Sequence, residues 1–217
     1  MIKALLFDFD GTISDAHGIA FKSLVRTLDD YGYGFDQKKA FKLLGSKMQI
    51  IFKGLGLNLG HIDSARRRFY KYFKNEAING GIKLCVSVKP LEKLKKEGYP
   101  LIVISNSETH FIKASIKKLG IKGLFNKVYG AEKFKTKDKL LKKIFKKMKI
   151  TPNEAIYIGD RFSDIEYARG AGCWAVAINN SCAWSDMKTI RKEKPDFIIK
   201  DFRGLKKVIE KLNKSSS

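Results

Sequence analysis

The stretch LLFDFDGT, residues 5–12, places two aspartates directly after a run of apolar residues. A short, continuous apolar run is typical of a strand that is buried on both faces of a parallel sheet. Asp8 and Asp10 would then lie at the carboxyl end of this strand, where two like charges repel each other and resist losing water. The pair therefore predicts a positively charged neighbour.

Other apolar runs alternate with amphipathic segments along the chain. With the first run, residues 2–7, the expected strands cover 100–104, 155–159, 175–179 and 196–199. Helical periodicity predicts helices over 90–97, 109–119, 137–148, 164–169 and 202–213. Gly98, Gly120 and Gly170 are expected to end the first, second and fourth of these helices. The alternation indicates an α/β fold with a doubly wound, mostly parallel sheet and a Rossmann-like core.

Residues 16–81 break this alternation because they contain helical patterns and no convincing strand. A loop of this length inside a compact domain needs structure of its own. We expect a helical cap over 16–81, inserted after the first strand. The α/β core would then comprise residues 1–15 and 82–217.

The composition limits the function classes. The 217 residues include 44 basic and 22 acidic side chains, a net charge of +22. Most of the lysines fit solvated helix faces, and neither an RNA-binding signature nor a zinc-finger spacing is present, so a nucleic-acid partner is not favoured. No apolar run is long enough to span a membrane and no signal-peptide pattern opens the chain, so we expect a cytoplasmic monomer or homodimer. The three cysteines form no CxxC pair and are assigned no chemistry.

Polar residues follow three of the expected strands. Asp8 and Asp10 follow the first, Ser105 follows the second, and Asp160 and Asp164 follow the third. Ligands bind outside the carboxyl ends of the strands in open parallel sheets, so these residues should meet in one crevice. Clustered carboxylates form a hard-oxygen environment that suits Mg²⁺. A metal ion would supply the missing positive charge.

Four segments together resemble the phosphatases of the haloacid dehalogenase-like superfamily, in the phosphoglycolate phosphatase-like branch with a helical cap. They are DFDGT (8–12), ISNS (104–107), KTKDKLL (135–141) and IGDRFSDIEYARGAG (158–172). The resemblance spans residues 1–201. Each segment alone would be weak, but their joint order and spacing are highly specific.

The resemblance implies the roles of the acidic residues. Asp8 would be the nucleophile that forms an aspartyl-phosphate, and Asp10 would be the general acid and base. Mg²⁺ would bind the carboxylates of Asp8 and Asp160 and the backbone carbonyl of Asp10. Asp164 would bind the metal through water or hold its ligands in place.

The resemblance also implies a set of phosphate-binding residues. The Ser105 hydroxyl and backbone amides that include Asn106 would hold the phosphoryl oxygens. Thr12 would orient the nucleophile loop. A lysine would offset the phosphate charge; two spacings of the family motif fall on Lys135 and Lys137, and Lys137 is favoured.

Substrate choice is expected to depend on the cap, where Gly45 resembles the glycine of the family's cap loop and places Ser46 and Lys47 within reach of the substrate. The predicted function is a Mg²⁺-dependent phosphomonoesterase acting on a small phosphorylated metabolite of the phosphoglycolate or sugar phosphate type. Three alternatives stay open. These are a phosphatase for nucleic-acid or nucleotide phosphates, a phosphomutase with the same core residues, and a binding or regulatory protein on this fold.

Overall fold

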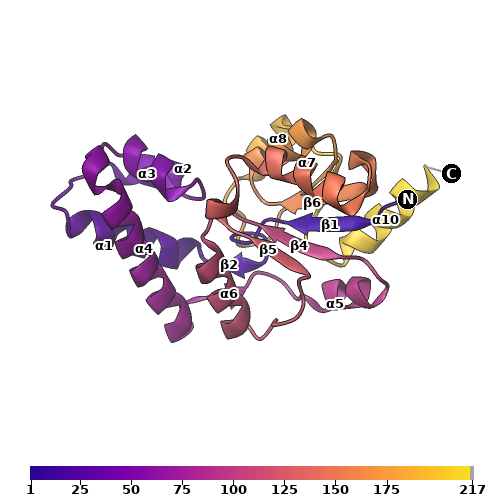
Figure 1. The fold of residues 1–217 in the computed structure, drawn as a ribbon, viewed down its shortest axis with the longest axis horizontal. Coiled ribbons are helices and arrows are strands. Elements are labelled where there is room, and N and C mark those ends of the chain that lie inside the picture. The colour runs from indigo at the N-terminus through magenta and orange to yellow at the C-terminus, as the bar shows by residue number, and fades with distance from the viewer. Residues whose placement is uncertain (216–217) are drawn as a thin grey trace.

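A six-stranded parallel sheet forms the centre of the molecule in the computed structural model, which describes residues 1–215 (Figure 1). Its strand order is β5-β4-β1-β6-β7-β8, and all neighbouring pairs are parallel. The strands are β1 (Ala4–Phe7), β4 (Leu101–Ile104), β5 (Lys127–Tyr129), β6 (Ala155–Gly159), β7 (Trp174–Ile178) and β8 (Phe197–Ile199). The predicted doubly wound α/β fold is confirmed.

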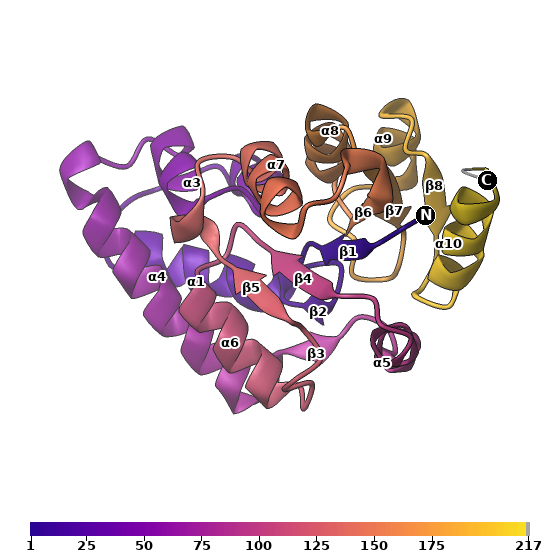
Figure 2. The same cartoon turned by 45° about the vertical axis from the view of Figure 1, so that its right-hand side comes forward.

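Helices cover both faces of the sheet (Figure 2). One face carries α5 (Lys89–Lys96), α6 (Thr109–Lys118) and α10 (Gly204–Lys214), and the other carries α7 (Lys137–Met148), α8 (Phe162–Ala171) and α9 (Met187–Lys192). Side chains alternate along β1, so Leu5 and Phe7 join the first core while Ala4 and Leu6 join the second. Burial on both faces explains why the strands are continuously apolar.

The helical segment between two short strands lies beyond the carboxyl ends of the sheet strands (Figure 1). It contains α1 (His17–Asp29), α2 (Gln37–Leu43), α3 (Met48–Gly54) and α4 (Ile62–Glu76). The flanking strands, β2 (Ser14–Asp15) and β3 (Lys83–Leu84), pair antiparallel as a two-stranded ribbon. The chain therefore leaves the sheet domain and returns to it at one place.

The sequence patterns missed the shortest elements. The strands β2, β3 and β5 and the helix α9 were not predicted, because two to six residues carry too little periodicity. The prediction that Gly170 ends a helix was wrong: α8 continues to Ala171, and Gly172 caps it in the left-handed conformation with φ of 80°. No helix within residues 1–215 has the length and apolarity needed to cross a membrane.

Candidate active site

Three adjacent strands bring the predicted site residues together. Asp8 follows β1, Ser105 follows β4, and Asp160 follows β6, and β1 lies between the other two strands. The Asp8 backbone N–H donates to the carbonyl of Ile158 at 2.8 Å, which continues the β1–β6 pairing to Asp8. The crevice expected at the carboxyl ends of the strands is therefore present.

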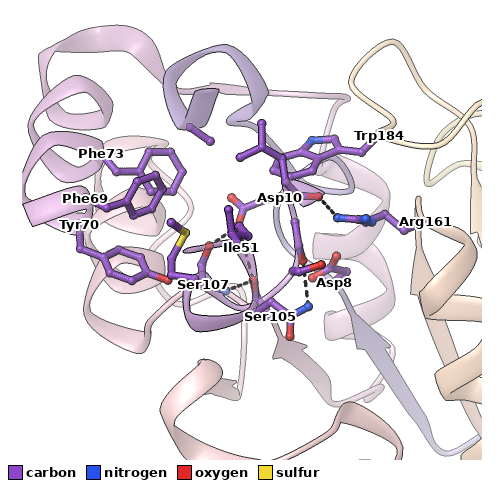
Figure 3. Close-up of a pocket in the computed structure, with 16 residues that line it drawn as sticks. Asp8, Asp10, Ile51, Phe69, Tyr70, Phe73, Ser105, Ser107, Arg161 and Trp184 are labelled. Carbon is purple, nitrogen blue, oxygen red and sulfur yellow. Dashed lines mark hydrogen bonds between the residues drawn. The ribbon is translucent and has the colours of Figure 1, made fainter. Parts of the chain in front are cut away.

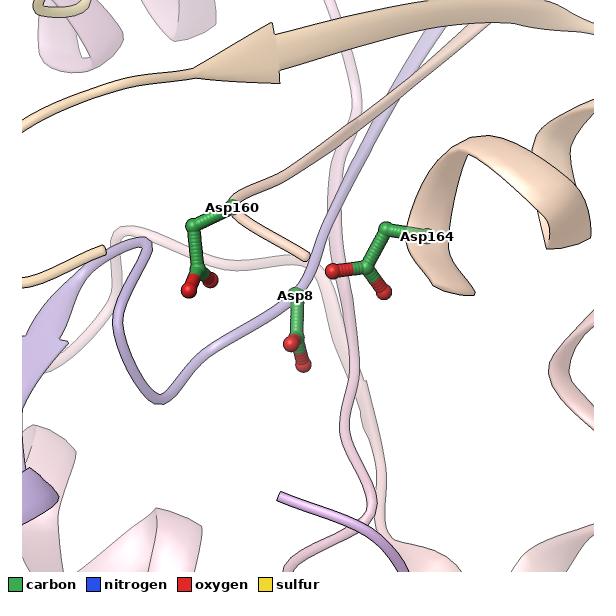
Figure 4. A group of neighbouring side chains, drawn as sticks. All are labelled: Asp8, Asp160 and Asp164. Carbon is green, nitrogen blue, oxygen red and sulfur yellow. The ribbon is translucent and has the colours of Figure 1, made fainter. Parts of the chain in front are cut away.

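Three buried carboxylates form one cluster, to which Asp8, Asp160 and Asp164 each contribute an oxygen atom (Figure 4). These oxygens all lie within 4.8 Å of one another. Burial, together with the neighbouring Asp164 and Asp10, raises the pKa of Asp8 to about 7 although Lys137 opposes the shift. Burial and the same kind of repulsion raise the pKa of Asp160 well above its ordinary value. The cluster is short of positive charge.

Lys137 is the buried cation of this cluster. Its Nζ lies 3.1 Å from Oδ1 of Asp8 and 2.8 Å from Oδ1 of Asp164. Burial alone would lower the pKa of Lys137, but the two carboxylates outweigh burial and raise it. The ammonium is therefore charged and stays in place. Lys135, the alternative lysine, is exposed and contacts none of these carboxylates.

The chemistry of the donor set fits a magnesium ion. Three buried carboxylates face a single ammonium group, and carboxylate oxygens are the protein ligands that Mg²⁺ prefers. The Asp10 side chain lies outside this cluster.

Hydroxyl groups surround the Asp10 carboxylate (Figure 3). Ser107 Oγ donates to Oδ2 at 2.6 Å, Ser14 Oγ donates to Oδ1 at 3.0 Å, and Ser105 Oγ lies 3.5 Å from Oδ2. Burial raises the pKa of Asp10, and the hydroxyl groups offset only part of that shift. A carboxyl group held in one orientation, with its pKa raised above the ordinary value, suits proton transfer. Ser107 was quoted in the motif but had no predicted role.

Thr12 and Asn106 contact other parts of the site. The Thr12 hydroxyl donates to Oδ1 of Asp160 at 2.7 Å, and the backbone N–H of Trp184 donates to Oδ2 at 2.8 Å. These two bonds fix the orientation of one carboxylate of the buried cluster. Asn106 Nδ2 donates to the carbonyl of Gly45 at 2.9 Å, so this side chain joins the sheet domain to the helical segment.

A cavity of about 30 Å³ lies between Asp8 and the helical segment. Gly45 and Ser46 line it, but Lys47 does not. The Lys47 ammonium donates instead to the carbonyls of Ala131 (2.7 Å) and Phe134 on the sheet domain. The structure therefore places Lys47 at a contact between the two parts of the chain.

Several cavity residues were missed by sequence reasoning. They are Arg161 and Trp184 on the sheet domain and, on the helical segment, Ala20, Leu44, Met48, Ile51, Phe69, Tyr70 and Phe73. The α4 aromatics have the spacing of an ordinary helix core, and only the approach of the helical segment to the sheet shows that they also face the cavity. Arg161 lies inside the quoted segment 158–172, between Asp160 and Asp164. A charged residue between two predicted site aspartates was the sequence signal that could have indicated a role in the site.

Known proteins resemble this chain in sequence and in structure. A phosphoglycolate phosphatase from Pasteurella multocida is 28% identical over 226 residues, which covers 96% of this chain and 98% of the relative. The pyrophosphatase PpaX of Bacillus velezensis is 25% identical over 211 residues, 94% of each protein. The solved structure of a haloacid dehalogenase-like family hydrolase from Streptococcus pneumoniae has the same fold, with a TM-score of 0.80 at 23% identity over 96% of this chain and 98% of that one. Residues 5–178 match the family model for haloacid dehalogenase-like hydrolases. The chain belongs to the haloacid dehalogenase-like hydrolase family.

Proposed function

We propose that this enzyme is a Mg²⁺-dependent phosphomonoesterase that hydrolyses a small phosphorylated metabolite through an aspartyl-phosphate on Asp8. The observation that carries the proposal is the pairing of two differently placed carboxyl groups. Asp8 lies in a carboxylate cluster beside a buried lysine, whereas Asp10 lies among hydroxyl groups outside it. Such a division suits one nucleophile and one proton donor.

In the first half of the reaction, an Asp8 carboxylate oxygen attacks phosphorus and the ester P–O bond breaks. Protonated Asp10 gives its proton to the departing alkoxide oxygen. Its burial and the resulting raised pKa keep a proton available for this step. Lys137, 3.1 Å from Asp8, helps to offset the negative charge of the phosphoryl oxygens.

In the second half, water attacks the phosphorus of the aspartyl-phosphate, and the deprotonated Asp10 accepts its proton. Inorganic phosphate leaves and the Asp8 carboxylate is restored. Ser105 and the backbone amide of Asn106 follow β4 and hold phosphoryl oxygens in both halves. Mg²⁺, bound by Asp8, Asp160 and Asp164, would supply positive charge that favours ionised Asp8 and the transferring phosphoryl group.

We also propose that residues 16–81 form a cap that moves relative to the core formed by 1–15 and 82–217. The cavity of about 30 Å³ is far smaller than the 300–1,000 Å³ of sites for drug-sized ligands, so a substrate needs the cap to open. Polar contacts hold the cap in its present position, among them Asn106 to the Gly45 carbonyl. Closure would exclude water from the intermediate.

The enclosed space favours a small leaving group over the end of a nucleic acid. A phosphomutase would use the same core residues, and product analysis separates the two reactions. The test is steady-state hydrolysis of p-nitrophenyl phosphate and of small phosphate esters, with Mg²⁺ and with EDTA. We expect turnover that needs the metal, releases inorganic phosphate and disappears in Asp8→Asn.

The intermediate can be tested separately with Asp10→Asn. This variant retains the nucleophile, and p-nitrophenolate leaves without a proton donor, but no general base is left to activate water. We expect intact-protein mass spectrometry to find one added phosphoryl group in Asp10→Asn and none in Asp8→Asn. Turnover by Asp8→Asn at the wild-type rate would exclude the proposed mechanism.

A further inference from the structure

A buried cation without an anion lies in the cavity wall. Arg161 follows Asp160 at the end of β6 and is only 9% exposed. One guanidinium nitrogen, Nη1, donates to the carbonyl of Leu44, but Nε is buried and has no hydrogen-bond partner. Over the part of the chain that the structure describes, Arg161 forms no ion pair with a carboxylate. Buried charges in proteins are ordinarily paired, so this one lacks its counterion.

A second unpaired donor lines the same cavity. The indole Nε1 of Trp184 is buried without a partner, and the Trp184 ring centroid lies 5.8 Å from the guanidinium carbon of Arg161. Unsatisfied buried donors are rare in proteins because each costs free energy. The two side chains occupy the Asp8 and Asp10 side of the cavity (Figure 3). The Cε3 edge of the indole ring lies beside the guanidinium group, and the unpaired Arg161 needs an acceptor from outside the described chain.

The backbone of the cap loop makes room for this arginine. Gly45 has a φ of 85°, and a Cβ atom at this position would lie 1.7 Å from Nη1 of Arg161. A side chain at position 45 would therefore displace the guanidinium group. The guanidinium group reaches the cavity only because residue 45 of the loop is a glycine, which has no Cβ.

The opposite wall is apolar. Met48, Ile51, Phe69 and Phe73 of the cap line it, and Tyr70 brings the one phenol group. A sugar would bury several hydroxyl groups against these side chains without partners, which costs free energy. A compact leaving group with an acceptor at one place fits the cavity better.

From these observations we infer that Arg161 binds a second anionic group of the substrate, so that the leaving group carries a carboxylate or a phosphate. The inference rests on the proposed function and deepens it. It assigns the site to phosphorylated small acids or to phosphoanhydrides and against phosphorylated sugars or simple alcohols. Arg161 provides the charge and donates charge-assisted hydrogen bonds to the anion's oxygens.

The test compares two phosphate esters, which differ in one carboxylate, with one phosphoanhydride. Phosphoglycolate carries a carboxylate, inorganic pyrophosphate carries a second phosphate, and ethyl phosphate carries neither. We expect wild type to have a kcat/KM at least about tenfold higher for one of the two anionic substrates than for ethyl phosphate, as a charge-assisted hydrogen bond predicts. Whichever of the two is preferred identifies the anion.

Variants test the assignment to Arg161. Arg161→Gln should reduce the preference for the anionic substrate about tenfold, mainly through KM, and Arg161→Lys should restore part of it. Arg169→Gln is the control for net charge, because Arg169 is exposed on α8, the helix that begins directly after Arg161, and does not line the cavity.

Three outcomes would overturn the inference. In the first, wild type has the same kcat/KM for ethyl phosphate as for the two anionic substrates. In the second, Arg161→Gln lowers kcat/KM equally for all substrates. In the third, Arg169→Gln reduces the preference as strongly as Arg161→Gln. In each case the proposed phosphatase function would stand. Absence of turnover on every ester, p-nitrophenyl phosphate included, would instead refute the proposed function itself. Circular dichroism verifies that each variant is folded.

Discussion

The substitution Gly45→Ala tests the fit between the cap loop and the core at a single atom. Gly45 lies between α2 and α3 with φ of 85°. An added Cβ would come within 1.7 Å of Arg161 Nη1 and 2.7 Å of Trp184 Cε3. Gly56→Ala is the matched control, because Gly56 is also in the cap and has φ of 86°, but no atom lies within 4 Å of a Cβ built there.

The two variants share one energetic cost and differ in another. Placing alanine in the left-handed region costs about 1–2 kcal/mol in both. In Gly45→Ala the Arg161 side chain must also move away, which breaks its hydrogen bond to the Leu44 carbonyl in a buried setting. Loss of a hydrogen bond from a charged group adds about 1.5–3 kcal/mol. We therefore expect Gly45→Ala to cost about 2.5–5 kcal/mol and Gly56→Ala about 1–2 kcal/mol.

Thermal unfolding followed by circular dichroism measures the difference. At about 2–4 °C per kcal/mol for a chain of this size, Gly45→Ala should melt several degrees below Gly56→Ala. If the cap opens to relieve the clash instead, the melting temperatures converge and only Gly45→Ala raises KM. Equal melting temperatures together with equal kinetic constants would refute the reasoning.

Three further predictions concern the buried charges. Lys137→Met should lower kcat on the order of 10²-fold, while exposed Lys135→Met should leave kcat within about twofold; steady-state kinetics decides between the lysines. Without metal, the pKa of Asp8 is raised to about 7 in the folded protein, from 3.8 in the unfolded chain. Folding therefore favours protonated Asp8, and this contribution to stability is fully present below pH 3.8 and is lost as the pH rises through 7. Metal-free protein should then be about 2 kcal/mol more stable at pH 5 than at pH 8 in urea titrations, and Asp8→Asn or saturating Mg²⁺ should reduce the difference. Burial, with a contribution from Cys182, raises the pKa of the Cys85 thiol, so iodoacetamide at pH 8 should alkylate Cys85 only after denaturation, as peptide mass spectrometry would detect.

The central strands could be predicted from the sequence because burial on both faces makes them continuously apolar. The runs that became β1, β4, β6 and β7 have this character. The edge strand β5 does not, since its three residues include an exposed lysine and an edge strand has only one paired neighbour. Its position depends on β4, which no local pattern shows.

The candidate site also contains residues whose positions follow from local sequence patterns and residues whose positions do not. Asp8 and Asp160 end strands and Lys137 begins a helix, so their places follow from elements that the local pattern predicts. Arg161 and Trp184 could not be assigned in this way. Their surroundings depend on where the cap loop meets the core, and residues more than 100 positions apart in the chain create that contact.

The two-stranded ribbon of β2 and β3 has a consequence for which segments can be exchanged in this fold. Ser14 pairs with Leu84 and Asp15 with Lys83, so the two points at which the chain crosses between the domains are direct neighbours. Opposite residues of an antiparallel pair have Cα atoms about 5 Å apart. Any folded segment whose ends are equally close can be inserted here without altering the order of the six strands. Recombination at this position exchanges the helical segment over the cavity and leaves Asp8, Asp10 and Asp160 where they are.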